Sequence, residues 1–267
     1  MTPKPAWLLP NLLSLDAPLV AVCWQALLAA DTGLALRPAG QAALGLTVWL
    51  IYIVDRLLDV RDPHALQTAR HRFYRDHRPL ASLAAIAILL VDLAVIVLFV
   101  RPVVVREGLL AAAGVLVYLV LLHGPGWRIP KELLAGILFT AGVFVVAAAN
   151  SAAPLAELGS RAAAFFLLCL SNLILIELWE SQELPRVTTK TSPRITVALC
   201  RTFPAWTVAL AAGASVAAYT GRSAWFLAIA ISAAALYGLF RIGVRWTLEA
   251  RRVLVDAVLL TPVVFLL

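Results

Sequence analysis

Long apolar runs alternate with short polar segments along the whole chain. Nine of these runs, each of about 15–22 residues, approach the ~20 apolar residues that a helix needs to cross a bilayer. They cover residues 12–33, 42–57, 80–100, 107–122, 132–149, 162–179, 202–220, 223–240 and 253–267. Prolines lie at or near many of their ends, where they do not interrupt a helix. The pattern predicts an all-α, polytopic membrane protein with nine transmembrane helices, forming a single domain over residues 1–267.

The composition agrees with this pattern. The chain has 267 residues, of which 62% are hydrophobic and 14% are charged. Its mean hydropathy is +0.91, far from that of soluble domains. The net charge of +7 comes from basic residues between apolar runs. We therefore interpret this charge as a topology signal and expect membrane lipids, but no nucleic acid, as partners.

The positions of the basic residues predict the orientation of the chain. With nine spans, 17 of the 22 lysines and arginines fall on the side of the N-terminus and five on the other side. Basic residues accumulate in cytoplasmic loops. We therefore expect a protein of a bacterial-type inner (plasma) membrane, with its N-terminus cytoplasmic and its C-terminus outside. Two longer loops, at about 58–79 and 180–201, would both be cytoplasmic and cap a common site.

Three aspartates close the second apolar run. Asp55, Asp59 and Asp62 are spaced i, i+4 and i+7, which places them on one face of a helix. Carboxylates at a polar helix end are suitable ligands for Mg²⁺, which often shares its oxygen ligands with a substrate phosphate. The alternative is a solvated helix end whose charges are neutralised by Arg56 and Arg61. The spacing is compatible with both interpretations.

The sixth apolar run also ends in acidic residues. Glu177 and Glu180 are i, i+3 neighbours, and Glu183 lies a further turn along. An ionised carboxylate at the depth of Glu177 is costly and indicates a functional site. The alternative is a helix end that pairs with Arg186 or Lys190. We predict that Glu177 and Glu180 join the three aspartates as catalytic residues and metal ligands.

Each acidic helix end is followed by basic residues, a combination that suits a metal-bound diphosphate. Carboxylates would bind magnesium, magnesium would bridge phosphate oxygens, and basic side chains would contact the remaining oxygens. The candidates for these contacts are Arg72, Arg78, Lys131, Lys190 and Arg194. The apolar helices around the site would accommodate a lipid tail. The sequence therefore predicts a lipid diphosphate as the ligand.

The first acidic segment resembles a motif of the UbiA superfamily of intramembrane prenyltransferases, Asn-Asp-x-x-Asp-x-x-x-Asp. Asp55 and Asp59 match its last two aspartates, with Ile51 and Tyr52 in place of Asn-Asp. Alternatively, Asp55 and Asp62 match its outer aspartates, with Leu58 in place of the middle one. The superfamily has nine transmembrane helices and a second aspartate-rich motif after the sixth. In this chain that region holds Asn172 and the glutamates.

Other segments are similar to the same superfamily. Residues 77–80, His-Arg-Pro-Leu, resemble the Arg-Pro-Leu that often follows the first motif. Tyr118 together with Pro130-Lys131-Glu132 resembles the junction of the fourth and fifth helices, which implies a diphosphate contact for Lys131. The resemblance implies a UbiA-like bundle with Mg²⁺ as the cofactor.

Three further aspartates lie inside or near the ends of apolar runs and should face the bundle interior. We expect Asp16 to orient an acceptor hydroxyl and, with Asn172 and Tyr118, to contact the substrate. We expect Asp256 to pair with Arg251 or Arg252. Asp92 has no partner that the sequence suggests.

The leading hypothesis is a magnesium-dependent prenyltransferase that moves a prenyl group from a polyprenyl diphosphate to an aromatic or lipid acceptor. A UbiA-type terpene cyclase and a non-catalytic lipid-binding or transport protein on the same fold are the alternatives. CDP-alcohol phosphotransferases are disfavoured because their Asp-Gly-x-x-Ala-Arg segment is absent after Asp55. Transporters often contain paired broken helices at the membrane midplane, and the sequence suggests no such pair.

Overall fold

The computed structural model describes residues 5–61, 68–123, 130–150, 154–183 and 194–267, and the regular structure of these residues is helical throughout. The long helices are α2 (Asp16–Thr32), α3 (Pro38–Asp59), α5 (Arg78–Phe99), α6 (Pro102–His123), α7 (Lys131–Asn150), α8 (Leu155–Glu183), α9 (Arg194–Gly221) and α10 (Ala224–Ile242). The shorter ones are η1 (Ala6–Leu8), α1 (Leu9–Leu12), α4 (Ala69–Asp76), η2 (Gly243–Arg245), α11 (Leu248–Val258) and α12 (Val263–Leu266). The predicted all-α class is confirmed for these residues.

Among the described residues, seven helices have the length and composition to cross a membrane. An eighth is added if α1 and α2 count as one bent span. Their outer surfaces carry many exposed leucines, valines and isoleucines, above all on α5 and α6. Because such surfaces are unfavourable in water, we conclude that this is a membrane protein. The predicted loops 58–79 and 180–201 are shorter than expected, since α4 and the ends of α8 and α9 occupy parts of them.

The first predicted helix, over residues 12–33, is continuous from Asp16 to Thr32 only, and a bend before Asp16 separates α2 from the shorter N-terminal helices. The segments Ala6–Leu12 and Asp16–Thr32 meet at an angle of 78°. At the bend, Ser14 adopts a positive φ of 55°, outside the helical region. Asp16 then begins α2, and its carboxylate accepts a hydrogen bond from the backbone N–H of Ala17 at 3.0 Å. This carboxylate complements the positive end of the α2 dipole.

The last predicted helix is broken as well. Residues 253–267 form the end of α11, a turn, and α12, because Pro262 has no N–H and cannot continue α11. Side chains from other helices satisfy backbone carbonyls at the break. The indole N–H of Trp24 donates to the Leu259 carbonyl at 2.8 Å, and the Ser232 hydroxyl donates to the Val258 carbonyl at 3.4 Å. The sequence of residues 253–267, an apolar run with a single proline, did not predict this break.

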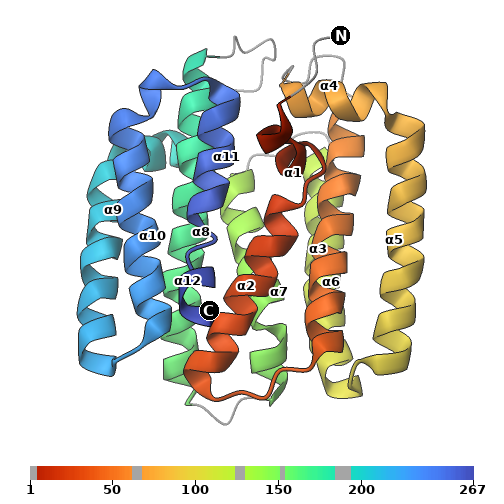
Figure 1. Ribbon diagram of the computed structural model, residues 1–267, viewed down its shortest axis with the longest axis horizontal. Helices are drawn as coiled ribbons and strands as arrows, with labels where there is room; N and C mark the ends of the chain where they lie inside the picture. Colours follow the sequence, from red (N-terminus) through yellow and green to blue (C-terminus); the bar gives the residue numbers. More distant parts are fainter. Residues whose placement is uncertain (1–4, 62–67, 124–129, 151–153, 184–193) are drawn as a thin grey trace.

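The helices pack around α8. It contacts α7, α9, α10 and α11, while α2 contacts α3 and α7. Aromatic rings fill the centre: Trp24 of α2 lies 4.9 Å from Phe165 of α8 and 5.0 Å from Trp225 of α10, between ring centroids. All three side chains are fully buried. Figure 1 shows α2 crossing in front of α7, with α9 and α10 on one side and α3, α5 and α6 on the other.

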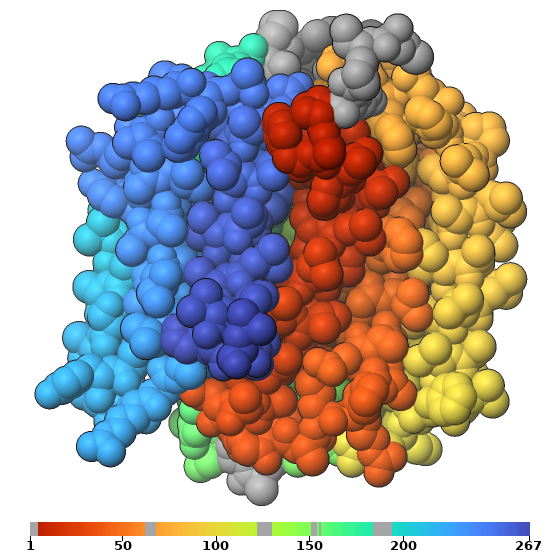
Figure 2. Space-filling view, in the orientation of Figure 1, coloured from red at the N-terminus to blue at the C-terminus, as the bar shows by residue number. Residues whose placement is uncertain are grey.

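The C-terminal segment closes one face of the bundle. Both α11 and α12 contact α2, and α11 also contacts α8 and α10. Figure 2 shows this segment beside the N-terminal helices on the front of the molecule. The two broken segments of the chain are therefore neighbours in space.

Candidate functional site

The acidic ends of α3 and α8 lie at the same end of the bundle, at the top of Figure 1, where α4, α7 and α11 begin. We call it the charged end; its charged side chains are Asp55, Arg56, Asp59, Arg70, Lys131, Glu177, Glu180, Glu183, Arg251 and Arg252. Lys131, the first residue of α7, interacts electrostatically with Glu177 and Glu180 of α8 and with Asp59 of α3. One basic residue therefore connects both acidic ends.

The end of α3 is organised by arginine and histidine. Arg56 donates a hydrogen bond to Asp59 at 2.7 Å, and its guanidinium lies 3.6 Å from Asp55. The Nε2 atom of His71 lies 3.6 Å from the same carboxylate oxygen of Asp59. The hydroxyl of Thr68, the N-cap of α4, lies 2.6 Å from the Nδ1 atom of His71 and so orients the ring. Asp62 lies outside the described residues.

The end of α8 pairs with α11, which the sequence did not suggest. Glu180 lies 2.7 Å from Arg252, and both side chains are buried. Glu183 forms an ion pair with Arg251, whose guanidinium lies 5.5 Å from the ring centroid of Trp179. The arginines expected to pair with Asp256 therefore pair with glutamates, and that prediction was wrong. The partners suggested for these glutamates, Arg186 and Lys190, lie outside the described residues.

Asp256 belongs to a separate polar network. Asn11 donates hydrogen bonds to Asp16 at 2.7 Å and to Asp256 at 3.2 Å. Asn172 donates to the Val255 carbonyl at 3.1 Å and lies 3.4 Å from the Asp256 carboxylate. The network joins α1, α2, α8 and α11 next to the charged end. Two predicted substrate-binding residues, Asp16 and Asn172, thus lie together.

The other predicted contacts are distributed around the charged end. Tyr118 of α6 interacts electrostatically with Asp55 and Asp59, which places its hydroxyl near the end of α3. Arg72, Arg78 and Arg194 are exposed on its rim. Asp92, for which the sequence suggested no partner, lies away from this end on α5 and accepts a hydrogen bond from Thr47 at 2.6 Å.

The predicted magnesium ligands that the structure describes, Asp55, Asp59, Glu177 and Glu180, are not grouped as a metal site. In the described part of the chain, no three His, Cys, Asp or Glu side chains are grouped so that they could hold a metal ion. Two of the predicted ligands are bound by arginines instead, Asp59 by Arg56 and Glu180 by Arg252. In the described part of the charged end, these two carboxylates are therefore partners of guanidinium groups.

Gly243 provides a specific test of packing at the charged end. A Cβ atom at this position would lie 2.8 Å from the ring of Trp179. We expect Gly243→Ala to lower the free energy of unfolding by about 1–3 kcal/mol, because the buried ring must move. Gly238→Ala is the matched control, since its Cβ would meet no atom within 4 Å. Denaturant titration of both variants in mixed micelles measures the difference, and equal stability would contradict the expected packing.

A second charged cluster lies at the opposite end of the bundle. Arg161 of α8 donates to Asp31 of α2 at 3.0 and 2.9 Å. Asp31 also accepts hydrogen bonds from the Ser223 hydroxyl at 2.9 Å and from the backbone N–H of Trp225 at 3.2 Å. With its carboxylate satisfied on several sides, Asp31 ties α2, α8 and α10 together. We assign it a structural role.

Comparisons of the chain with protein-family models, with curated proteins and with solved structures found no match. The relationship to the UbiA superfamily therefore remains a prediction based on the motifs in the sequence.

Proposed function

We propose that this protein is an intramembrane prenyltransferase, which moves a prenyl group from a polyprenyl diphosphate to an aromatic or lipid acceptor at the charged end. The observation that supports this proposal best is the meeting of the α3 and α8 ends around Lys131. It brings acidic and basic side chains together at one end of the bundle, next to apolar helices. A ligand with a charged head and a long apolar tail suits such an environment.

In the proposed reaction, the bond between the allylic carbon and the diphosphate oxygen breaks, and negative charge develops on the leaving diphosphate. Lys131 and Arg56 would stabilise this charge, since positive groups held close to a developing negative charge stabilise the transition state. The acceptor would form a new bond to the allylic carbon and lose a proton to a carboxylate of the charged end, such as Glu177 or Asp55. Asp59 would act by positioning Arg56, to which it is bound.

The nine-helix, UbiA-like arrangement is part of the same proposal. It counts the bent pair α1 and α2 as one crossing and α11 with α12 as another. Under this proposal the charged end faces the cytoplasm, since the basic residues accumulate there.

A carrier without catalysis is the second candidate, because the chain contains two neighbouring broken segments. Asn11 of α1 donates to Asp256 of α11, so polar groups link the break after α1 to the helix before the second break. Broken helices with polar groups at the break are typical of transporter binding sites. A carrier would bind the lipid diphosphate without cleaving it.

Purified protein incubated with radiolabelled geranylgeranyl diphosphate, magnesium and a panel of aromatic and isoprenoid acceptors tests these alternatives. We expect diphosphate release and a prenylated acceptor. Asp59→Ala should reduce release about 100-fold, because displacement of Arg56 by about 1 Å is sufficient for such a loss. Asp76→Ala, which changes an exposed carboxylate on α4, is the matched control and should retain full activity.

The other possible results separate the remaining candidates. A cyclised product formed without an acceptor would indicate a terpene cyclase. Tight binding with no release in the unaltered protein would indicate the carrier. Equal release by the Asp59→Ala and Asp76→Ala variants would contradict the proposed site.

A further inference from the structure

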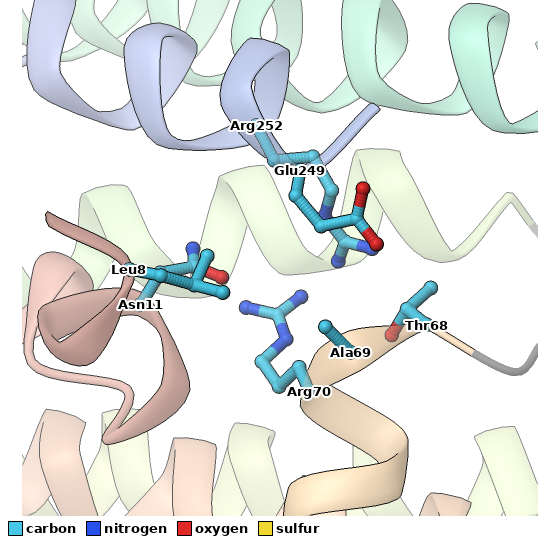
Figure 3. A pocket seen from close by; sticks show the side chains of 7 residues that line it. All are labelled: Leu8, Asn11, Thr68, Ala69, Arg70, Glu249 and Arg252. Atoms are coloured by element: carbon cyan, nitrogen blue, oxygen red, sulfur yellow. The ribbon is translucent and has the colours of Figure 1, made fainter. Parts of the chain in front are cut away.

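A hollow lies next to the charged end, between the N-terminal helices, α4 and the start of α11. Its cavity volume is small, about 10 Å³, and the hollow opens to solvent. Its lining residues are Leu8, Asn11, Thr68, Ala69, Arg70, Glu249 and Arg252. Figure 3 shows the guanidinium groups of Arg70 and Arg252 reaching toward this space from opposite walls. Neither arginine was among the predicted phosphate contacts.

Arg70 is buried, and no described residue provides a counterion for it. Only 8% of the residue is exposed, and its Nε atom has no hydrogen-bond partner among the described residues. None of the described carboxylates lies within ion-pair distance of its guanidinium. Burying a charge without a partner is costly. The fold nevertheless places this unfavourable charge in a hollow. An unfavourable arrangement of this kind indicates a ligand site.

Two more guanidinium groups lie close to Arg70. Arg56 and Arg252 both interact with it electrostatically, and the Nε atom of Arg56 also lacks a hydrogen-bond partner among the described residues. Burial, reinforced by these two positive charges, lowers the pKa of Arg70 to about 9, so the group is still charged at neutral pH. Arg56 and Arg252 are each paired with a carboxylate, so Arg70 is the one of the three guanidinium groups whose charge no described carboxylate pairs with directly.

The carboxylates nearby are already engaged or lie on another wall. Glu180 is paired with Arg252, while Asp16 and Asp256 accept hydrogen bonds from Asn11. The charges of Asp16 and Asp256 offset part of the repulsion at Arg70, without a direct ion pair. Glu249 lines the opposite side of the hollow. No described carboxylate therefore competes directly with a ligand for the Arg70 guanidinium.

We infer that this hollow binds a phosphate or diphosphate group directly through Arg70 and Arg252, with Arg56 behind them, and that binding needs no metal ion. Guanidinium groups bind phosphate oxygens in pairs of parallel hydrogen bonds. For its ligand class the inference rests on the proposed function, but it moves the diphosphate from the predicted carboxylate-bound magnesium to arginines. The same chemistry would accept a phospholipid headgroup, and the experiment separates the two sources.

The test measures binding of inorganic pyrophosphate to the purified full-length protein by calorimetry in neutral detergent with EDTA. We expect binding without magnesium. Arg70→Met should weaken it at least about tenfold, the effect of losing one charge-assisted contact. Thermal unfolding of this variant without ligand should occur at the same or a higher temperature, because an unpaired buried charge has been removed. Arg75→Met, on the exposed side of α4, should bind as the unaltered protein does.

A second pair of variants tests the site without removing Arg70. Ala69 lines the hollow at the first position of α4, where an acidic residue is well tolerated. Ala69→Glu should give Arg70 a partner and abolish pyrophosphate binding, whereas Ala69→Gln, of nearly the same size, should retain it within about threefold. Retained binding in Ala69→Glu or in Arg70→Met would overturn the inference. A clear loss of stability in Arg70→Met would also overturn it, since Arg70 would then have a structural role.

The source of the phosphate follows from two further titrations. Tighter binding of geranylgeranyl diphosphate than of pyrophosphate, lost in Ala69→Glu, supports a prenyl diphosphate as the ligand. Pyrophosphate binding that is blocked in nanodiscs of phosphatidylglycerol, but not in nanodiscs of phosphatidylcholine, supports a headgroup site. This result would overturn the diphosphate assignment. Intact pyrophosphate binding with no prenyl transfer would contradict the proposed function alone. Intact prenyl transfer, together with pyrophosphate binding that Ala69→Glu leaves unchanged, would contradict this inference alone.

Discussion

Asp31→Ala is expected to lower the free energy of unfolding by about 3–5 kcal/mol, because it leaves the Arg161 guanidinium buried without its main partner. It also removes the acceptor for the Ser223 hydroxyl and for the backbone N–H of Trp225. The side chains of Asp31 and Arg161 are only 5% and 9% exposed, so water cannot replace these contacts. Unfolding by SDS in mixed micelles, followed by tryptophan fluorescence, measures the loss.

Glu157 provides the matched control for this prediction. It also pairs with Arg161, at 2.8 Å, but its side chain is 46% exposed. Glu157→Ala should cost less than about 1 kcal/mol, as exposed ion pairs contribute little. If both variants lost the same stability, burial of the Asp31 pair would not explain its contribution.

Trp24→Ala should have a comparably large effect, about 3–5 kcal/mol, because it empties the centre of the aromatic cluster. Trp24 packs against Phe165 and Trp225, and none of the three is accessible to solvent. In a membrane most of this lost stability comes from packing, since lipid is as apolar as the protein interior. The same SDS titration measures the loss of stability.

Trp24→Phe separates packing from hydrogen bonding at this position. Phenylalanine keeps part of the ring volume but cannot donate to the Leu259 carbonyl, which the break between α11 and α12 leaves without a helical partner. We expect a smaller loss of about 1–3 kcal/mol, the cost of a buried unpaired polar group. A loss equal to that of Trp24→Ala would mean that the hydrogen bond, rather than the packing, dominates.

The two ends of the bundle use charge in different ways. At the Asp31 end, the buried arginine is fully paired and stabilises the fold. At the charged end, Arg70 is buried without a counterion among the described residues, an arrangement that lowers stability unless a ligand is bound. Such a contrast is expected where a protein retains an unfavourable arrangement for binding.

Much of the fold follows from the sequence because it depends on local composition. Apolar runs of sufficient length become helices, and polar residues with prolines separate them. The acidic ends of α3 and α8 were recognised from residues three or four positions apart, which share a helix face without any tertiary information. The placement of both ends on one side followed from the distribution of basic residues.

The breaks in the first and last helices could not be predicted in the same way. A break in an apolar segment is tolerated only where other groups satisfy the freed backbone. Those groups come from far along the chain: Trp24 serves the carbonyl of Leu259, which lies 235 residues away. No local pattern contains this information.

The sequence by itself determined that this chain is a helical membrane protein with two acidic helix ends, since helix formation and membrane insertion depend on residues close together in the chain. The tertiary structure alone decided which charges meet. It joined Glu180 to Arg252, joined Asp31 to Arg161, and placed Arg70 where no described carboxylate pairs with it. Pairing across a bundle depends on how helices pack. The sequence alone does not distinguish which of its many arginines pairs with a given carboxylate.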